Sequence, residues 1–377
     1  MKNQIIFYAF SSQSWDCYVP IITELIKQEP ESEQWMGVYA PCNQYSFRNE
    51  QSKTIFDRLK QNFKHPRETT QQKPKGYKYV LITTHIPDQN HDLNEGFYIH
   101  VPHGSAFGNN LTADYVISCY QASDVYCTIS AAEEQYITTN LGEKTSKNKK
   151  FTLTGCPKND FFADYISSSQ QRREEIKQAI KHSLGIDSKK SIVFLASHWT
   201  ERGTLRRFGT SLIHALSTLG DQVQIIQGAH PNLWTNHVSS ETSTWIYQAL
   251  CHERDKGTAL LSMGTSDAMA LLAADVVVGD ISSIAIEAAL LEKAILLNID
   301  KSSFRNQQIY EIYKNMSAQF EGADDLLQKF IHGVDFPKER ELAFRKVKEM
   351  FGFNLGNASS KVASIILEAK NQCELLR

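Results

Sequence analysis

Residues 276–300 read VVVGDISSIAIEAALLEKAILLNID, and this stretch decides the fold. An apolar run ends in a Gly-Asp pair, two serines follow, and a second apolar run continues almost to position 300. The pattern predicts a buried strand, a tight turn, a helix that begins at Ser282 or Ser283, and a second buried strand. A helix N-terminus carries unpaired N–H groups and a partial positive charge, so this turn can bind phosphate. The alternative is a plain serine N-cap with Glu287 exposed.

The composition is that of a soluble globular enzyme. The 377 residues are 41% apolar and 22% charged with a formal net charge of -2, so general nucleic-acid binding is not expected. Seven scattered cysteines with no Cys-x-x-Cys pair are typical of a reducing compartment and argue against a zinc site. The N-terminus lacks a signal-peptide pattern, and no apolar run approaches the roughly 20 residues of a transmembrane helix. We expect a cytoplasmic protein and leave peripheral contact with the inner face of the cell membrane open.

Short apolar runs alternate with helical patterns along the chain, which predicts two parallel α/β sheets at this length. We expect two Rossmann-like domains at 1–165 and 166–345, with a C-terminal helix in 346–377 that crosses back to the first. Ligands in such sheets bind at the C-terminal ends of the strands. The expected strands are 4–10, 34–39, 79–83, 96–100, 114–118, 125–129, 151–154, 191–195, 222–227, 258–262, 275–278 and 294–298.

Two histidines follow predicted strands. His103 is followed by Gly104, which permits close approach of the backbone to a ligand. Histidine titrates near neutral pH, so His103 is a candidate general base. His230 precedes Pro231, which restricts it to an extended conformation, and its ring could contact a phosphate or stabilise a leaving group. The plainer interpretations are a turn histidine bonded locally and an isolated His-Pro dipeptide.

Two further loops after strands are polar. TGCPKND at 154–160 leaves a strand through a Gly-x-Pro corner, and the plainer interpretation is a corner between domains. The loop after the strand at 191–195 leads to Arg202, Arg206 and Arg207. Guanidinium groups suit bidentate binding of phosphate. The alternative for each arginine is a solvated loop.

In their order and spacing, these motifs resemble the CDP-glycerol glycerophosphotransferases of teichoic acid synthesis. HG at 103–104, TGCPKND at 154–160, HP at 230–231 and ADVVVGDISSIAIEAALLEK at 274–293 occur in the order of the family. FNLGNASS at 353–360 resembles the family's C-terminal segment. The resemblance therefore spans almost the whole chain, although no single motif is specific.

The resemblance implies an α/β fold of the GT-B type, two Rossmann-like domains whose parallel sheets face a cleft. The first domain would serve the acceptor and the second the nucleotide donor. The implied reaction is inverting transfer of glycerol phosphate or ribitol phosphate from a CDP-linked donor, with release of CMP. The acceptor would be the hydroxyl of a polysaccharide or of a lipid-linked chain. Neither a cofactor nor a catalytic metal is implied.

The same resemblance implies roles for single residues. His103 would be the general base on the acceptor hydroxyl, and His230 would be the second catalytic residue, in contact with the donor phosphates. Ser282 and Ser283 would hold the pyrophosphate at the helix start, and Glu287 would reach the ribose. The full set expected to bind the donor is Ser282, Ser283, Glu287, Gly104, Asp280, Arg202 and Arg206, with Arg207 a further candidate.

Two departures from the family pattern leave the alditol and the acceptor open. SAFG at 105–108 stands where the family has Thr-Pro-Leu-Lys, and Ile281 stands where it has tyrosine. Both are compatible with an enzyme of capsule or other surface-polysaccharide synthesis. Two alternatives remain: a GT-B glycosyltransferase or 2-epimerase that uses a nucleotide-sugar, and a GT-B-like subunit that binds nucleotide or a partner without turnover.

Overall fold

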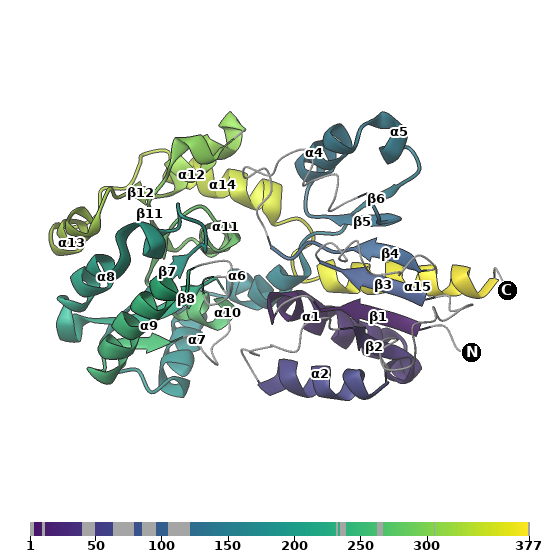
Figure 1. The fold of residues 1–377 in the computed structure, drawn as a ribbon, viewed down its shortest axis with the longest axis horizontal. Helices are drawn as coiled ribbons and strands as arrows, with labels where there is room; N and C mark the ends of the chain where they lie inside the picture. The colour runs from purple at the N-terminus through teal and green to yellow at the C-terminus, as the bar shows by residue number, and fades with distance from the viewer. Residues whose placement is uncertain are drawn as a thin grey trace. The chain divides into compact units, whose positions relative to one another are not determined.

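The computed structural model describes residues 4–9, 12–39, 50–62, 79–84, 96–104, 121–230, 233, 239–261, 267–304 and 306–375. The chain divides into two compact units (Figure 1). Unit 1 contains the described residues up to 161 and those from 350 onward, and unit 2 contains the described residues from 162 to 349. The strand expected at 114–118, the departure at 105–108 and Pro231 lie outside the described residues.

Unit 1 is built on a six-stranded parallel sheet with the order β2-β1-β3-β4-β5-β6. Its short apolar strands are buried against helices, and α15 packs beside α1 and against β1, β3 and β4. The strands are β1 (Gln4–Tyr8), β2 (Met36–Tyr39), β3 (Tyr79–Thr83), β4 (Phe97–His100), β5 (Val125–Thr128) and β6 (Lys150–Leu153). The helices are α1 (Ser12–Gln28), α2 (Glu50–Asn62), α4 (Ala131–Leu141), α5 (Glu143–Ser146) and α15 (Ala358–Leu375).

A buried tyrosine on α1 joins the C-terminal ends of β1 and β3. The hydroxyl of Tyr18 donates to the carbonyl of Tyr8 at 2.7 Å and accepts from the amide of Thr84 at 3.1 Å. The hydroxyls of Ser14 and Thr84 lie 2.9 Å apart. These side-chain bonds satisfy backbone groups where the strand pairing ends, and they fix the edge of the sheet that His103 follows.

The motif at 154–160 lies against the segment that leads into α15. Gly155 has a φ of +83°, and a Cβ at this position would lie 2.3 Å from the carbonyl oxygen of Phe353. Only glycine fits both the conformation and the space. Asn354 returns a hydrogen bond from its side-chain amide to the carbonyl of Thr154 at 3.0 Å. Unit 1 is made of two stretches of sequence, and the end of the first therefore packs against the start of the second at this corner.

Asp160 supplies the N-terminal cap of α15 from a distant part of the sequence. Its carboxylate accepts hydrogen bonds from three backbone amides around the helix start: Gly356 at 2.7 Å, Ala358 at 3.2 Å and Ser359 at 2.7 Å. An anion here satisfies N–H groups that the helix leaves unpaired and complements the helix dipole. The corner motif thus holds the C-terminal helix on the sheet of unit 1.

Unit 2 is also built on a six-stranded parallel sheet, with the order β12-β11-β10-β7-β8-β9. The strands are β7 (Ser191–Ser197), β8 (Val223–Ala229), β9 (Ala259–Leu261), β10 (Val276–Gly279), β11 (Ala294–Leu297) and β12 (Ala318–Gln319). The helices are α6 (Ala163–Ser167), α7 (Gln170–Ser183), α8 (Thr204–Ser217), α9 (Ser240–Asp255), α10 (Asp267–Ala273), α11 (Ser283–Leu290), α12 (Gln307–Met316), α13 (Ala323–His332) and α14 (Arg340–Phe351).

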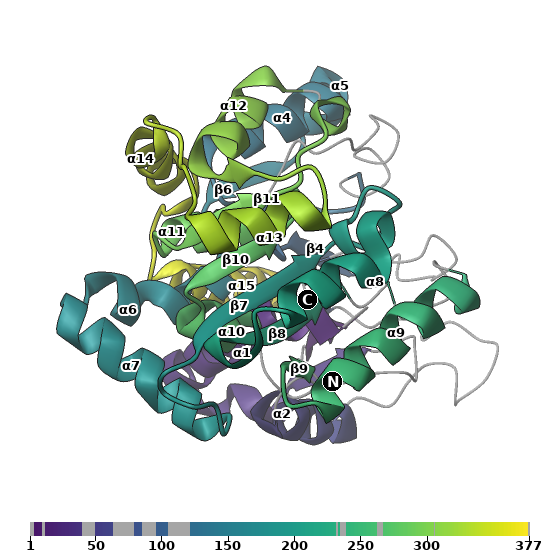
Figure 2. The same ribbon diagram turned by 90° about the vertical axis from the view of Figure 1, so that its left-hand side faces the viewer.

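Helices cover both faces of this sheet. α8 packs between α9 and α13 over one face, and α10 packs against α7 and α11 on the other (Figure 2). Strand order reverses between β7 and β10, because the chain winds outward from β7 in one direction and from β10 in the other. Ligands of doubly wound sheets bind beyond the strand ends at such a switch point.

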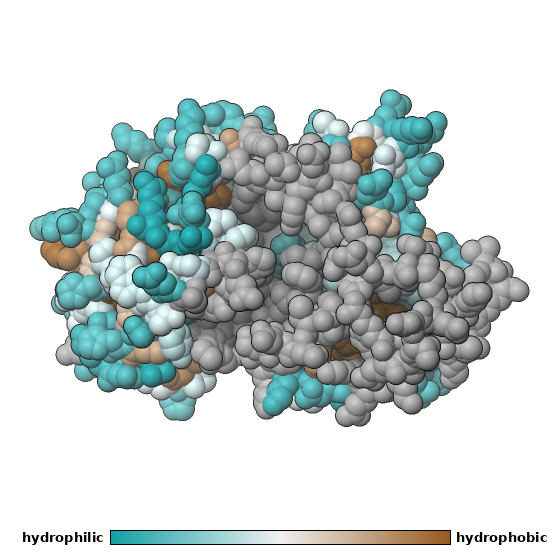
Figure 3. All heavy atoms as spheres, viewed as in Figure 1, coloured by the Kyte–Doolittle hydropathy of each residue, from teal (hydrophilic) through white to brown (hydrophobic). Residues whose placement is uncertain are grey.

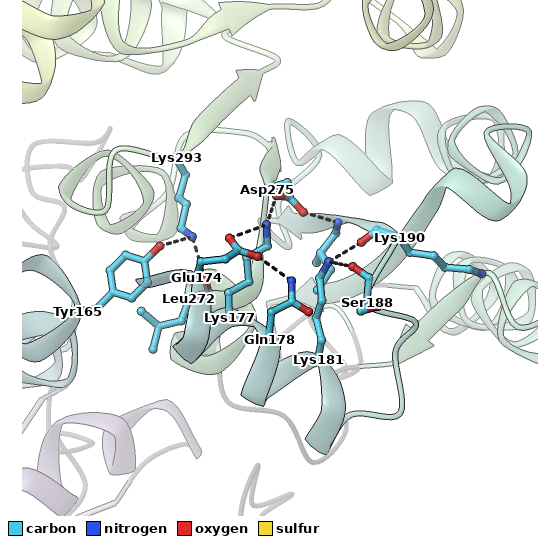
Figure 4. A network of polar contacts seen from close by, with 11 residues as sticks. Tyr165, Glu174, Lys177, Gln178, Lys181, Ser188, Lys190, Leu272, Asp275 and Lys293 are labelled. Atoms are coloured by element: carbon cyan, nitrogen blue, oxygen red, sulfur yellow. Dashed lines mark hydrogen bonds and ion pairs between the residues drawn. The ribbon is translucent and has the colours of Figure 1, made fainter. Parts of the chain in front are cut away.

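A network of polar contacts around three lysines lies at the N-terminal ends of the unit 2 strands, opposite the strand ends where ligands bind (Figure 4). The ammonium group of Lys293 donates to the Tyr165 hydroxyl at 3.1 Å and to the carbonyl of Leu272 at 2.9 Å. Burial lowers the pKa of Lys293 to about 8. Lys177 binds Asp275, whose other oxygen accepts from the Ile192 amide at 2.8 Å. These contacts fasten α6 and α7 to the starts of β7 and β10.

Within the described ranges, no helix is both long and apolar enough to cross a membrane.

Replacing Asp160 with alanine is expected to lower the free energy of unfolding by about 1–2 kcal/mol, because the start of α15 loses its capping carboxylate. Urea unfolding followed by circular dichroism measures this change. Asp164→Ala, which removes an exposed carboxylate from the first turn of α6, is the matched control and is expected to change stability by less than about 0.5 kcal/mol. Equal stability of the two variants would show that the cap does not hold α15.

Candidate functional site

Polar residues of unit 2 meet at the C-terminal ends of β7, β8 and β10. Ser197 on β7 pairs with Ala229 on β8, so His198 and His230 are the next residues along two neighbouring strands. Their ring centroids lie 5.3 Å apart. β10 pairs with β7 on the other side, and Asp280 follows its last residue. The structure therefore gathers two imidazoles and a carboxylate at the switch point of the sheet.

Asp280 organises the loop between β7 and α8. Its buried carboxylate accepts hydrogen bonds from the amide of Thr204 at 2.7 Å and from the amide of His198 at 3.1 Å. The hydroxyl of Ser197 lies 3.4 Å away. Burial raises the pKa of Asp280 to about 6, against the opposing effect of these hydrogen bonds. Asp280 is among the residues expected to bind the donor, but its carboxylate points to amides of its own chain, so we propose a positioning role.

His198 presents a defined tautomer. Its Nδ1 accepts a hydrogen bond from the Thr200 amide at 3.3 Å, which places the proton of the neutral ring on Nε2. Burial lowers the pKa of His198 to about 4, so the ring is neutral at pH 7. Nε2–H is then a hydrogen-bond donor beside the ring of His230. His198 is absent from the residues expected at the site, and its position one residue past a strand end is the signal that could have found it.

The start of α11 has the geometry expected of an anion site. Ser282 is the N-cap residue with extended backbone (φ −156°, ψ 167°), and within the described part of the chain its side chain caps no helical amide. Its carbonyl accepts from the Tyr313 hydroxyl at 2.8 Å. Ser282 and Ser283 are half-buried. Their hydroxyls and the first N–H groups of the helix lie at its positive end, where a phosphate is stabilised.

Two other residues of this segment are buried. A Cβ on Gly279 would lie 2.2 Å from the carbonyl oxygen of Ala196, so glycine is needed where β10 runs beside β7. Glu287 lies one turn after Ser283 on α11, and its side chain has no exposed surface. The plain-cap alternative requires an exposed Glu287 and is wrong on this point. The role of Glu287 toward ribose stays a prediction.

The arginines of the β7–α8 loop and of the first turn of α8 make different contacts. Arg206 on α8 is half-buried and donates to the carbonyl of Trp199 in the preceding loop at 3.3 Å. Arg202 donates to the Ser303 hydroxyl at 2.9 Å, and Arg207 donates to the Asn298 side chain at 2.8 Å. The last two line an open pocket of about 470 Å³, the arginine pocket, whose lining residues are Glu201, Arg202, Arg207, Ile299, Asp300 and Lys301.

His103 lies in unit 1, after β4. Its side chain is exposed, and half-buried Gly104 follows it. Desolvation by the surrounding protein lowers the pKa of His103 to about 4, the positive charge of Lys158 adds to this, and a hydrogen bond with the Thr84 backbone opposes it. Because the ring remains open to water, desolvation is incomplete, but Lys158 acts in the same direction and the ring is neutral at pH 7. The nearby His100 is buried in the core.

Among the residues that the structure describes, no three His, Cys, Asp or Glu side chains are placed to hold a metal ion.

The raised pKa of Asp280 predicts a pH dependence of stability. Because the folded state binds this proton more tightly than the unfolded state, the contribution of Asp280 is fully present below about pH 4 and is lost by about pH 6. Relative to Asp280→Asn, the wild-type chain should therefore lose on the order of 1–3 kcal/mol of unfolding free energy between pH 4 and pH 7. Urea unfolding of the wild type and of Asp280→Asn at several pH values measures this loss, and Asp255→Asn, at an exposed position, is the control variant. If the difference in unfolding free energy between wild type and Asp280→Asn did not change with pH, the prediction would be wrong.

Comparison with solved structures identifies the fold. The wall teichoic acid polymerase TagF aligns with a TM-score of 0.63 at 14% identity, over 98% of this chain and 89% of that chain. The UDP-GlcNAc 2-epimerase from Neisseria meningitidis, bound to UDP-GlcNAc, aligns with a TM-score of 0.56 at 13% identity, over 98% of this chain and all (100%) of that chain. At such low identity the likeness concerns the fold, and it confirms the expected α/β architecture of the GT-B type.

Comparison of sequences identifies the family. A search of curated proteins found no match. A family model, described as CDP-Glycerol:Poly(glycerophosphate) glycerophosphotransferase, matches residues 1–368. This range includes every strand-end motif described above. The resemblance of those motifs is thereby confirmed, and the chain belongs to the CDP-glycerol:poly(glycerophosphate) glycerophosphotransferase family and is a transferase of that kind.

Proposed function

We propose that the enzyme transfers an alditol phosphate, glycerol phosphate or ribitol phosphate, from a CDP-linked donor to an acceptor hydroxyl and releases CMP. The observation that carries this proposal is the junction of three features at one switch point: the positive end of α11, the paired imidazoles of His198 and His230, and Asp280 behind them. A variant of TagF soaked with CDPG has a similar fold, with a TM-score of 0.65 at 14% identity, over 98% of this chain and 89% of that chain.

The donor pyrophosphate would bind at the start of α11. The hydroxyls of Ser282 and Ser283 and the first amides of the helix would donate to phosphate oxygens. His230 and His198 would donate to the same group from the ends of β8 and β7. Preorganised donors of this kind stabilise charge that develops on a leaving group in the transition state. Glu287, further along α11, is our candidate for the ribose.

His103 would act as the general base. A neutral imidazole can accept the proton of the acceptor hydroxyl, and the lowered pKa keeps it neutral at physiological pH. The acceptor oxygen then forms a bond to the phosphorus of the alditol phosphate. The bond from that phosphorus to the bridging oxygen breaks, and CMP leaves with the electron pair. Transfer of phosphoryl groups depends mainly on such positioning and charge stabilisation.

The acceptor and the place of the reaction are proposed from the family alone. We propose a polysaccharide or a lipid-linked chain as acceptor, and the cytoplasmic face of the cell membrane as the place of reaction.

Replacing His103 or His230 with alanine is expected to reduce CMP release from CDP-glycerol or CDP-ribitol by at least about 100-fold, because the base or a leaving-group contact is lost. Release is followed by chromatography, and circular dichroism confirms folding. His182→Ala on α7, an exposed histidine, is the control and should retain wild-type turnover. Wild-type turnover in both site variants would overturn the proposal. If His103 is the base, the kcat of the wild-type enzyme should stay constant down to about pH 5 and fall as the pH approaches about 4, the pKa of His103.

A second function is favoured by the fold shared with a UDP-GlcNAc 2-epimerase, namely use of a nucleotide-sugar. Thermal unfolding with added nucleotides separates the two. We expect CMP, CDP and CDP-glycerol to raise the unfolding temperature more than UDP does, because the proposed donor carries cytidine. Stabilisation by UDP alone would favour the nucleotide-sugar enzyme. Binding of CDP-glycerol without CMP release, across a panel of acceptors, would favour a binding subunit.

A further inference from the structure

The arginine pocket adjoins the proposed pyrophosphate site but is a separate feature. β7 and β11 are the two neighbours of β10 in the sheet, and α11 starts just after β10. The pocket is formed by the loop that follows β7, the first turn of α8 and the segment that follows β11. Its walls therefore stand on both sides of the strand that leads to the helix start. Its volume, about 470 Å³, is within the range of small-molecule sites, about 300–1,000 Å³.

Arg207 is held in place by a buried partner. Its Nη1 donates to the side-chain oxygen of Asn298 at 2.8 Å. Asn298 is itself fixed, because its amide nitrogen donates to the carbonyl of Phe320 at 2.7 Å and its backbone N–H to the carbonyl of Gly279 at 2.9 Å. Among the described residues, the other guanidinium N–H groups of Arg207 have no hydrogen-bond partner. A preoriented guanidinium edge of this kind suits phosphate.

The second wall of the pocket carries an oriented carboxylate. Oδ1 of Asp300 accepts from the amide of Ser302 at 2.9 Å and from its hydroxyl at 2.7 Å. Oδ2 lies 3.6 Å from Nε of Arg202, whose Nη1 donates to Ser303 at 2.9 Å. These bonds lower the pKa of Asp300 and join the two loops that line the pocket. An ionised carboxylate offers only acceptors, so it recognises hydroxyl groups.

The pocket therefore combines fixed cations for a phosphate with carboxylates for hydroxyls. Lys301 adds a third cation, Glu201 adds a second carboxylate, and Ile299 is the single apolar lining residue. A nucleobase would call for a larger apolar or aromatic face. Much of the coloured surface of unit 2, on the side of α8 and α13, is hydrophilic (Figure 3). The chemistry that fits this pocket is a polyhydroxy phosphate.

We propose that the arginine pocket is the subsite for an alditol phosphate, with Arg207 and Arg202 on its phosphate and Asp300 on its hydroxyl groups. This inference rests on the proposed function and adds to it the residues that recognise the transferred unit. Two sources share the chemistry: the alditol phosphate of the donor and the terminal unit of an acceptor chain. In the donor, the phosphate of this unit is the distal phosphate of the pyrophosphate, so the arginine pocket would share that phosphate with the start of α11 and the paired histidines, and Asp300 would select the hydroxylated unit.

Calorimetry on the full chain tests the proposal with CMP, CDP-glycerol, sn-glycerol 3-phosphate and inorganic phosphate as probes. Arg207→Gln and Asp300→Asn should each weaken sn-glycerol 3-phosphate binding by about 10- to 100-fold, because a hydrogen bond to a charged group is lost. CMP affinity should change by less than about twofold, which also shows that each variant is folded. Arg254→Gln, an exposed arginine on α9, is the matched control and should bind every probe as wild type does.

Competition between probes identifies the source of the ligand. If CDP-glycerol displaces sn-glycerol 3-phosphate, the pocket holds the donor's own alditol, and if both bind together it holds the terminal unit of the acceptor. The proposal is overturned if inorganic phosphate binds as tightly as sn-glycerol 3-phosphate, or if both variants bind sn-glycerol 3-phosphate as wild type does. Failure of the proposed function would differ, because the wild-type chain would then bind sn-glycerol 3-phosphate but release no CMP from CDP-glycerol.

Discussion

The candidate site of unit 2 depends on one buried interaction, the carboxylate of Asp280 against the amides of His198 and Thr204. It joins the end of β10 to the loop that leaves β7, at the point where strand order reverses. A buried carboxylate is costly in free energy unless several donors compensate for its lost hydration. Here two backbone amides and the Ser197 hydroxyl do so, and they belong to the segment from the end of β7 to the start of α8, which carries His198 and the arginines. The positions of His198 and of the arginines therefore depend on the carboxylate of Asp280.

The acidic residues of the family-like motifs share this inward role. Asp160 caps α15 across nearly 200 positions of sequence, and Asp280 receives the first amide of α8. Each carboxylate accepts N–H groups at the start of a helix that lies elsewhere in the sequence. This hydrogen bonding joins segments that are distant in sequence without a large apolar contact. The histidines and serines of the same motifs lie at strand ends. A short motif therefore contains both a residue that shapes the backbone and a residue positioned for chemistry, a division that residue type alone does not reveal.

Sequence periodicity predicted the strands well, because short apolar runs between helices leave few other arrangements. The additional strand β12 has two residues, too few for any periodicity, and is set by pairing with β11. Side-chain direction was less predictable. Arg206 and Arg207 are adjacent in sequence, yet helical geometry sends one to Trp199 and the other into the arginine pocket. The pairing of His198 with His230 depends on strand register, and the interior position of Asp280 depends on three elements packed around it; local sequence specifies neither.

Neutral histidines shape the electrostatics of the proposed reaction. Burial lowers the pKa of His198, and the charge of Lys158 acts in the same direction on His103, so neither ring adds positive charge at pH 7. A CDP-linked donor is an anion, and the countercharge must come from other groups. The positive end of α11 and the guanidinium groups of Arg202 and Arg207 are placed to supply it, and both are fixed by hydrogen bonds before a ligand arrives. The imidazoles can then serve as directional donors and as an uncharged base. This separates the binding of charge from the transfer of the proton.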